Sequence, residues 1–131
     1  MFCLFVLLFF LIQGDFEAVK LLLLGFAIIY AITVVIRTLY FKDRPEKFKH
    51  DSFLERLDAS SFPSLHAARS TLVFAFLSST VNKPYFTALC ALIVLVTCIS
   101  RIKLKCHDWK DVTAGIVLGL ASFAISIILI R

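Results

Sequence analysis

The sequence predicts an all-α protein, a multi-pass bundle of transmembrane helices with four spans and a short apolar helix at the N-terminus. Of the 131 residues, 60% are hydrophobic and the mean hydropathy is +0.94, whereas soluble domains are about 45–50% apolar. Residues 21–36, 85–100 and 112–130 contain no charged side chain. With their flanks, these runs reach the roughly 20 residues that a span needs. The length suits one integral membrane domain over residues 1–131.

Turn and capping signals divide the chain into five predicted helices. Residues 1–12 are wholly apolar but short, and they lack the basic start and the small-residue cleavage site of a secretory signal. We therefore expect them to remain, either as a short or tilted span or as a helix packed against the bundle. Residues 13–15 predict a turn. Pro45 should end the second helix near residues 42–44, and serine with proline in residues 61–64 should start the third. The longer helices are therefore expected over residues 16–41, 61–81, 85–102 and 107–130.

Residues 46–61 mix charged and apolar side chains. This pattern favours a short amphipathic helix that lies in the membrane interface. A solvated loop is the alternative. Either form would join the second and third helices on one side of the membrane.

The placement of the net charge of +5 indicates which partners to expect. The cations cluster in loops at the predicted helix ends, where they would meet anionic lipid headgroups. We therefore expect the lipid bilayer and a lipid substrate as partners, and no nucleic acid, because no soluble surface interleaves cations with aromatic residues. The four cysteines include no closely spaced pair of the kind that zinc sites use. We expect no metal and no cofactor.

The stretch at residues 100–111, SRIKLKCHDWKD, places ionisable side chains between two apolar runs. Such groups at a membrane helix end are costly to desolvate and by default indicate a functional site. His107 and Asp111 are four residues apart and so share a helix face. Asp111 can therefore accept from one ring nitrogen of His107 and leave the other as a nucleophile. Small residues, which favour close packing of membrane helices, continue the face of Asp111 at Gly115, Gly119, Ser122 and Ser126.

Alternating spans would bring four helix ends to one membrane face. These ends carry three arginines, one serine, two histidines and one aspartate: Arg37, Arg44, Arg101, Ser64, His66, His107 and Asp111. Arginine forks match the oxygens of phosphate, and helix starts at Ser64 and Asp108 add N–H donors. His66 can serve as an acid. The residues predict phosphoryl transfer through a phosphohistidine, without a metal.

The same residues resemble the type 2 phosphatidic acid phosphatase superfamily, whose members share a three-part signature with vanadium haloperoxidases. The patterns of that family are K-x6-RP, PSGH and SR-x5-H-x3-D. They stand here as Arg37-x6-Arg44-Pro45, Pro63-Ser64-Leu65-His66 and Ser100-Arg101-x5-His107-x3-Asp111. The third part matches fully, whereas Arg37 replaces a lysine and Leu65 replaces a glycine.

The resemblance implies a metal-independent membrane phosphatase that hydrolyses a phosphomonoester or diphosphate lipid, such as a phosphatidate, a phosphatidylglycerophosphate or an isoprenyl diphosphate. It implies that His107 is the nucleophile, that Asp111 orients it, and that His66 protonates the leaving alkoxide and then activates water. The phosphate would be bound by Arg37, Arg44, Ser64 and Arg101. Two alternatives stay open: transfer of the phosphoryl group to an acceptor other than water, and a degenerate family member that binds lipid without catalysis.

The distribution of cations predicts the orientation in the membrane. Of the 14 Lys and Arg residues, all but Lys20, Lys83 and Arg131 fall on the side of the predicted site. The positive-inside rule then favours a cytoplasmic site, although many members of the family that the chain resembles face outward.

Overall fold

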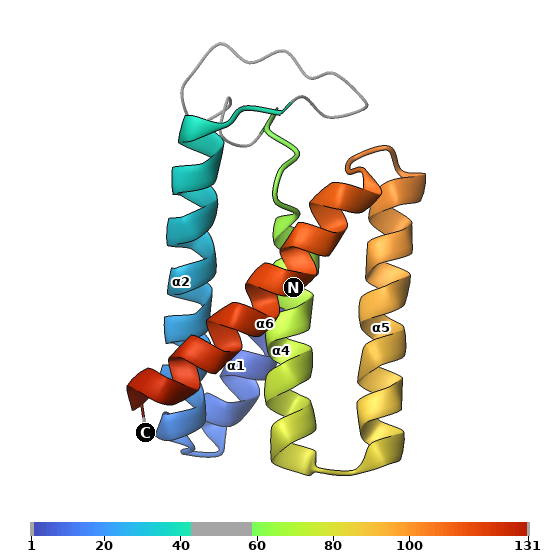
Figure 1. The fold of residues 1–131 in the computed structure, drawn as a ribbon. Helices are drawn as coiled ribbons and strands as arrows, with labels where there is room; N and C mark the ends of the chain where they lie inside the picture. The colour runs from blue at the N-terminus through green and yellow to red at the C-terminus, as the bar shows by residue number, and fades with distance from the viewer. Residues whose placement is uncertain (1, 43–58, 131) are drawn as a thin grey trace.

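The structure is a computed structural model that describes residues 2–42 and 59–130, drawn as a ribbon in Figure 1. These residues form five α-helices and no strand, which confirms the all-α prediction for this part of the chain. The helices are α1 (Phe2–Ile12), α2 (Phe16–Leu39), α4 (Leu65–Val81), α5 (Pro84–Lys103) and α6 (Trp109–Ile130). The interface helix predicted for residues 46–61 lies outside the described residues, apart from residues 59–61.

Three described helices, not the predicted four, are long and apolar enough to cross a membrane: α2, α5 and α6. The prediction of a fourth such span was wrong for α4, which has 17 residues and carries His66, Arg69 and several hydroxyl side chains. The reason is its position, because α4 packs against α1, α2, α5 and α6. A helix with four packed neighbours does not need to be apolar all round, and its His66 and Arg69 line a cavity instead of packing against a neighbouring helix. The short apolar helix predicted at the N-terminus is α1.

The helix ends divide the bundle into two dissimilar ends. The C-terminal ends of α2 and α5 and the N-terminal ends of α4 and α6 lie together, at the top of Figure 1. We name this the loop end. The turn end, at the bottom, holds the two short connections at residues 13–15 and 82–83. The arrangement agrees with the prediction that four helix ends share one side.

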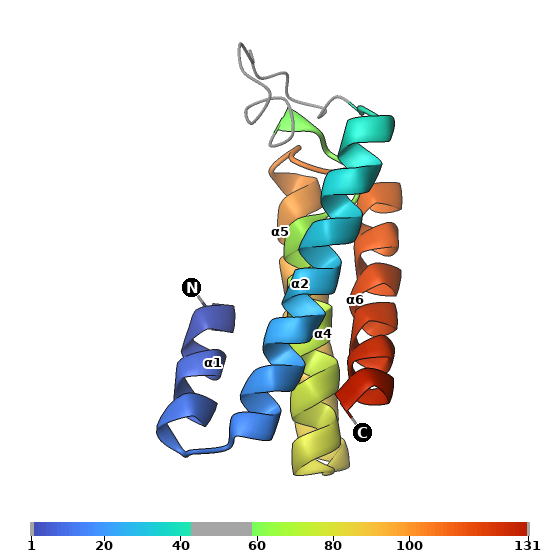
Figure 2. The same ribbon diagram turned by 90° about the vertical axis from the view of Figure 1, so that its left-hand side faces the viewer.

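Two faces of α4 are covered differently. Figure 2 shows α6 on one side of α2 and α4, and α1 on the other side, beside the half of the bundle nearer the turn end. Helices α2 and α5 both pack against α4 but not against each other. On the side of α1, the half of α4 nearer the loop end is therefore flanked by α2 and α5 without a described helix across it.

Small residues bring α6 close to α4, as the sequence predicts. Gly115, Gly119, Ser122 and Ser126 are all buried. A Cβ added at Gly115 would lie 2.5 Å from the carbonyl oxygen of Ser64, which is nearer than real Cβ contacts occur. The glycine therefore allows the start of α4 to rest directly on α6.

Helix α2 ends earlier than the position of Pro45 predicts. Its last residue is Leu39, and Tyr40 is extended, with φ −133° and ψ 97°. The backbone N–H of Ser61 donates to the carbonyl oxygen of Lys42 at 2.8 Å. Lys42 thus pairs with the segment that precedes α4 instead of continuing α2, and this turns its side chain toward the bundle.

Candidate active site

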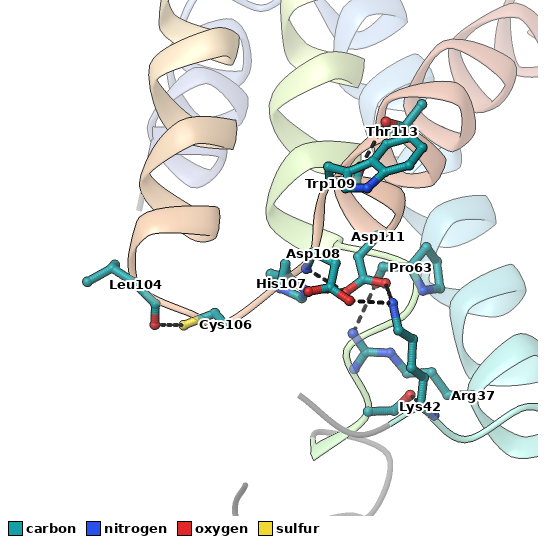
Figure 3. Close-up of polar contacts among 11 residues, drawn as sticks. Arg37, Lys42, Pro63, Leu104, Cys106, His107, Asp108, Trp109, Asp111 and Thr113 are labelled. Carbon is teal, nitrogen blue, oxygen red and sulfur yellow. Dashed lines mark hydrogen bonds and ion pairs between the residues drawn. The ribbon is translucent and has the colours of Figure 1, made fainter. Parts of the chain in front are cut away.

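A buried carboxylate, Asp111, is the centre of a polar cluster at the loop end (Figure 3). Its Oδ1 accepts a hydrogen bond from Lys42 Nζ at 2.6 Å. Its Oδ2 accepts from the backbone N–H of Asp108 at 2.9 Å and lies 3.8 Å from Nδ1 of His107. His107 is also buried. The two side chains are therefore in contact at ion-pair distance, which is longer than a hydrogen bond, and His107 lies in the connection before α6, not on the first turn of the helix.

The local fold at the start of α6 explains why Asp111 lies there. Trp109 is the first helical residue, and the carbonyl oxygen of Asp108 accepts from Val112 N at 3.2 Å. Asp111 is thus the third residue of the helix, from which a carboxylate can reach back to the N–H that precedes the helix. The side chain of Asp108 pairs with Lys42 at 3.1 Å. Lys42 therefore forms ion pairs with both carboxylates at the start of α6, Asp108 and Asp111.

The start of α4 is attached directly to the same cluster. Ser64 is the residue before α4, and its backbone N–H donates to the carbonyl oxygen of Asp111 at 3.0 Å. The Ser64 hydroxyl is buried and makes no hydrogen bond within the described part of the chain. A buried hydroxyl beside the N–H groups of a helix start is suited to hold an anion.

Two of the three predicted arginines contribute to the loop end in different ways. Arg37, buried in the last turn of α2, donates through Nη2 to the carbonyl oxygen of Pro63 at 3.2 Å. The carbonyl oxygen of Arg101 accepts from the backbone N–H of His107 at 3.3 Å, so the two residues are neighbours. Arg44 lies outside the described residues.

His66 is placed differently from the other predicted residues. It lies in the first turn of α4 and is exposed. Its side chain lines a lateral cavity together with residues of α1, α2 and α5. The structure thus gathers Arg37, Ser64, Arg101, His107 and Asp111 at the loop end, and it turns His66 at the same end toward the side of the bundle.

Comparison with protein families identifies the family to which this chain belongs. The model of the PAP2 superfamily matches residues 18–131. The chain belongs to the PAP2 superfamily. The resemblance seen in the three sequence motifs is confirmed, and with three apolar helices of spanning length the chain is an integral membrane protein.

The fold of this PAP2 protein is similar to the crystal structure of Aquifex aeolicus LpxE. The TM-score is 0.77 and the sequence identity is 27%. The match covers 96% of this chain and 76% of that chain. Comparison with curated proteins gives no significant match.

Lys42 is the residue of this candidate site that the sequence interpretation missed. The sequence interpretation treats it as one of several interface charges, whereas it makes the shortest ion pair of Asp111. Partial burial lowers the pKa of Lys42, but hydrogen bonds to Asp111 and Asp108 outweigh this and raise it above its ordinary value. The available signal was its position, since Lys42 falls inside the first PAP2 motif between Arg37 and Arg44.

Leu65 takes the place of the glycine in the second PAP2 motif without disturbing the helix. It is the first residue of α4. Its side chain is partly buried against a cluster formed by Ile29, Ala68, Leu72 and Leu118. Leucine here packs into the bundle and leaves the backbone N–H at the helix start, where α-helices have no internal partner for it.

Proposed function

We propose that this protein is a metal-independent lipid phosphatase of the PAP2 superfamily, which hydrolyses a phosphomonoester or diphosphate lipid through a phosphohistidine. The observation that carries the proposal is the buried contact between His107 and Asp111, whose oxygens are held by Lys42 and by the backbone of Asp108. Family membership supports the reaction class.

His107 is the nucleophile in this proposal. Its Nδ1 faces Asp111, so Nε2 is the nitrogen that attacks phosphorus. As the N–P bond forms, the bond from phosphorus to the lipid oxygen breaks and its electron pair stays on that oxygen. Asp111 stabilises the positive charge that develops on the imidazole. Water then attacks phosphorus, which releases phosphate and restores His107.

His66 is the acid that protonates the leaving oxygen, and afterwards the base that takes a proton from water. Its exposure on a lateral cavity supports this role. The leaving group is the lipid, which reaches the site from the bilayer side, whereas His107 lies in the connection between α5 and α6. The two histidines would therefore act on opposite sides of the phosphorus.

The equatorial oxygens of the phosphoryl group need positive charge and N–H donors in the transition state. We assign this role to Arg37, Arg44 and Arg101, to the hydroxyl of Ser64 and to the backbone at the start of α4. The buried hydroxyl of Ser64, which lacks a partner among the described residues, supports its assignment. Lys42 Nζ donates to Asp111 Oδ1 at 2.6 Å and so holds this carboxylate in place beside the nucleophile.

The decisive experiment is phosphate release from a panel of lipids by the purified protein in detergent, with a chelator present. The panel holds a phosphatidate, a phosphatidylglycerophosphate and an isoprenyl diphosphate. Release of inorganic phosphate with chelator present is expected. Release only after addition of a divalent metal would contradict the metal-free reaction. Transfer to an added alcohol without release to water would favour the phosphotransferase alternative, and lipid binding without either reaction would favour a non-catalytic protein.

The distribution of Lys and Arg favours a cytoplasmic site. A single cysteine at the loop end decides this point, for example Lys103→Cys in a chain whose four native cysteines have been replaced by serine or alanine. Lys103 is exposed in the last turn of α5. Protection from a membrane-impermeant thiol reagent in intact cells, and labelling after lysis, is the result expected for a cytoplasmic site.

A further inference from the structure

A cation that the proposed reaction does not use lies one helical turn from His66. Arg69 Nη1 donates to the phenol oxygen of Tyr30 at 2.9 Å, and its Nε donates to the carbonyl oxygen of Leu65 at 3.3 Å. A guanidinium has five N–H groups, and these bonds occupy two of them. Charged groups within membrane helices are costly and mark ligand sites by default.

Arg69 and His66 line the same cavity, which has a volume of about 440 Å³. Ligand sites are commonly about 300–1,000 Å³. The wall that faces these two side chains comes from three other helices and includes Leu4, Leu7, Tyr30 and Thr97. The cavity therefore combines a cationic end, next to the proposed acid, with a largely apolar remainder.

The cavity lies where the start of α1 meets the other helices, since Cys3, Leu4 and Leu7 of α1 form part of its wall. Helix α1 has 11 residues and lies beside the half of the bundle nearer the turn end (Figure 2). Helices α2 and α5, which do not pack against each other, flank the uncovered part of α4. The cavity thus faces the side of the bundle, where the bilayer lies, and not the solvent above the loop end.

A narrow, largely apolar slot adjoins the cavity. Its volume is about 100 Å³, and it shares Ser70 and Thr97 with the larger cavity. The rest of its wall comes from α4 and α5 and includes Phe74, Leu77 and Val94. A slot of this size suits one hydrocarbon chain better than two.

We propose that this cavity binds the leaving part of a single-chain diphosphate lipid, and that Arg69 contacts the phosphate that stays on the lipid. The proposal rests on the phosphatase function above. In a diphosphate the second phosphorus is bonded to the oxygen that His66 would protonate, so the phosphate it carries falls within reach of a side chain one turn away. A guanidinium fork matches such a phosphate, whereas the leaving group of a phosphatidate is a neutral diacylglycerol.

The chemistry balances without a further reactant. His107 Nε2 forms a bond to the terminal phosphorus, and the bond from that phosphorus to the bridging oxygen breaks. The electron pair stays on the bridging oxygen, which leaves as part of an isoprenyl monophosphate with a proton from His66. Arg69 stabilises the charge that the second phosphate gains in this step. Water then converts the phosphohistidine to inorganic phosphate and free His107.

The test uses two substrates with the same chain, geranylgeranyl diphosphate and geranylgeranyl monophosphate, together with a diacyl phosphatidate. Initial rates of phosphate release are measured in detergent for the full chain and for Arg69→Ala, Arg69→Lys and Lys103→Ala. Lys103 is the matched control, because it is an exposed cation at the loop end outside both cavities. Tyr30→Phe removes the phenol that holds Arg69 and keeps the ring.

We expect Arg69→Ala to lower the diphosphate-to-monophosphate ratio of kcat/KM at least about tenfold, the effect of losing a charge-assisted contact. Arg69→Lys should lower the ratio less, since it keeps the charge but not the fork, and Tyr30→Phe less again. Lys103→Ala should leave both rates unchanged. Yield and elution volume of each variant report folding, and Arg69→Lys preserves the test if Arg69→Ala does not fold.

The two proposals fail in different ways. If the full chain releases phosphate from the monophosphate or the phosphatidate but not from the diphosphate, or if the Arg69 variants lower all rates equally, the assignment of the cavity is wrong and the phosphatase function stands. If the full chain releases phosphate from none of the three lipids, the phosphatase function fails and the assignment falls with it.

Discussion

The two ends of the bundle use charged side chains in opposite ways. At the turn end, Lys20 pairs with Glu17 at 2.8 Å, and both side chains are mostly exposed, at 63% and 70%. Exposed pairs of this kind contribute about 0–1 kcal/mol. At the loop end, Lys42 pairs with Asp111 at 2.6 Å, and the Asp111 side chain is fully buried. The Lys42 side chain is 25% exposed, so its loss should cost less than the roughly 3–5 kcal/mol of a fully buried pair, but it would still leave a buried carboxylate without this cation.

The helix caps differ in the same way. At the turn end, Asp15 Oδ1 accepts from Ala18 N at 3.0 Å, and Asn82 ends α4 in a left-handed conformation with φ 48°. These residues satisfy one helix end each. At the loop end, Asp111 contacts Lys42, Asp108 and His107 at once. A carboxylate that does more than cap its own helix is the feature that distinguishes the candidate site from an ordinary helix end.

The largest expected effect is the loss of the nucleophile. His107→Ala should reduce kcat/KM for the best lipid of the panel to less than about one thousandth. Thr113→Ala is the local control, because Thr113 is exposed near the start of α6 and its hydroxyl donates to the carbonyl oxygen of Trp109. A near-normal rate for His107→Ala would remove His107 from the reaction and leave the loop end without a nucleophile.

Asp111→Asn should have the next largest effect. The amide keeps the shape of the side chain but removes the charge that stabilises an imidazolium, and we expect a loss of about 10²–10⁴-fold in kcat/KM. At the turn end, Asp15→Asn keeps an effective N-cap and should leave kcat/KM unchanged. If the two variants had equal activity, Asp111 would be no more than a cap, and the contrast between the two ends would disappear.

Lys42→Ala should lower kcat/KM about 10- to 100-fold and also lower the melting temperature, because Asp111 stays buried without its nearest cation. Lys20→Ala at the turn end should change neither kcat/KM nor the melting temperature.

The ion pair of Lys42 should also make the stability depend on pH, because the folded-state pKa of Lys42 is raised. The stability that the pair contributes is therefore fully present below about pH 10.4, the ordinary lysine value, and is lost as the pH rises through the folded-state pKa. Thermal unfolding of wild type and variant from pH 7 to 11 measures this, and curves that stay equally far apart over the whole range would exclude the ion pair as the cause.

The sequence predicted the parts of the site that depend on local spacing. The spacing of four residues brings His107 close to Asp111, although His107 lies just before α6 and not on a shared helix face. The helix ends meet because the apolar runs alternate in direction. The number of apolar spans was overestimated, because hydropathy does not reveal that α4 lies at the centre of the bundle. Lys42 was missed because its position depends on the pairing of its backbone with Ser61, and no local pattern encodes that contact.

The lateral cavity was not predictable for a related reason. The periodicity of α4 gives the residues on each of its faces but not which face meets α6. Gly115 and Gly119 set that orientation through close contact with the backbone of α4, and His66 and Arg69 then face the uncovered side. The positions of His66 and Arg69 on α4 thus depend on two glycines of α6.

Gly115→Ala tests that link and has the smallest expected effect. The added Cβ would lie 2.5 Å from the carbonyl oxygen of Ser64, so the start of α4 must move away from α6 and the bond from Ser64 N to the carbonyl oxygen of Asp111 must lengthen. Overpacking of this kind costs about 1–3 kcal/mol, and a displaced site should lose about tenfold in kcat/KM. Gly14→Ala at the turn end is the matched control, because its φ of 75° strains alanine while nothing lies within 4 Å of the added Cβ. Both variants should melt at a lower temperature, but only Gly115→Ala should lose activity in the temperature range where the protein is folded. Equal activities would mean that the site tolerates a shift of α4, and that the close approach of α6 serves packing alone.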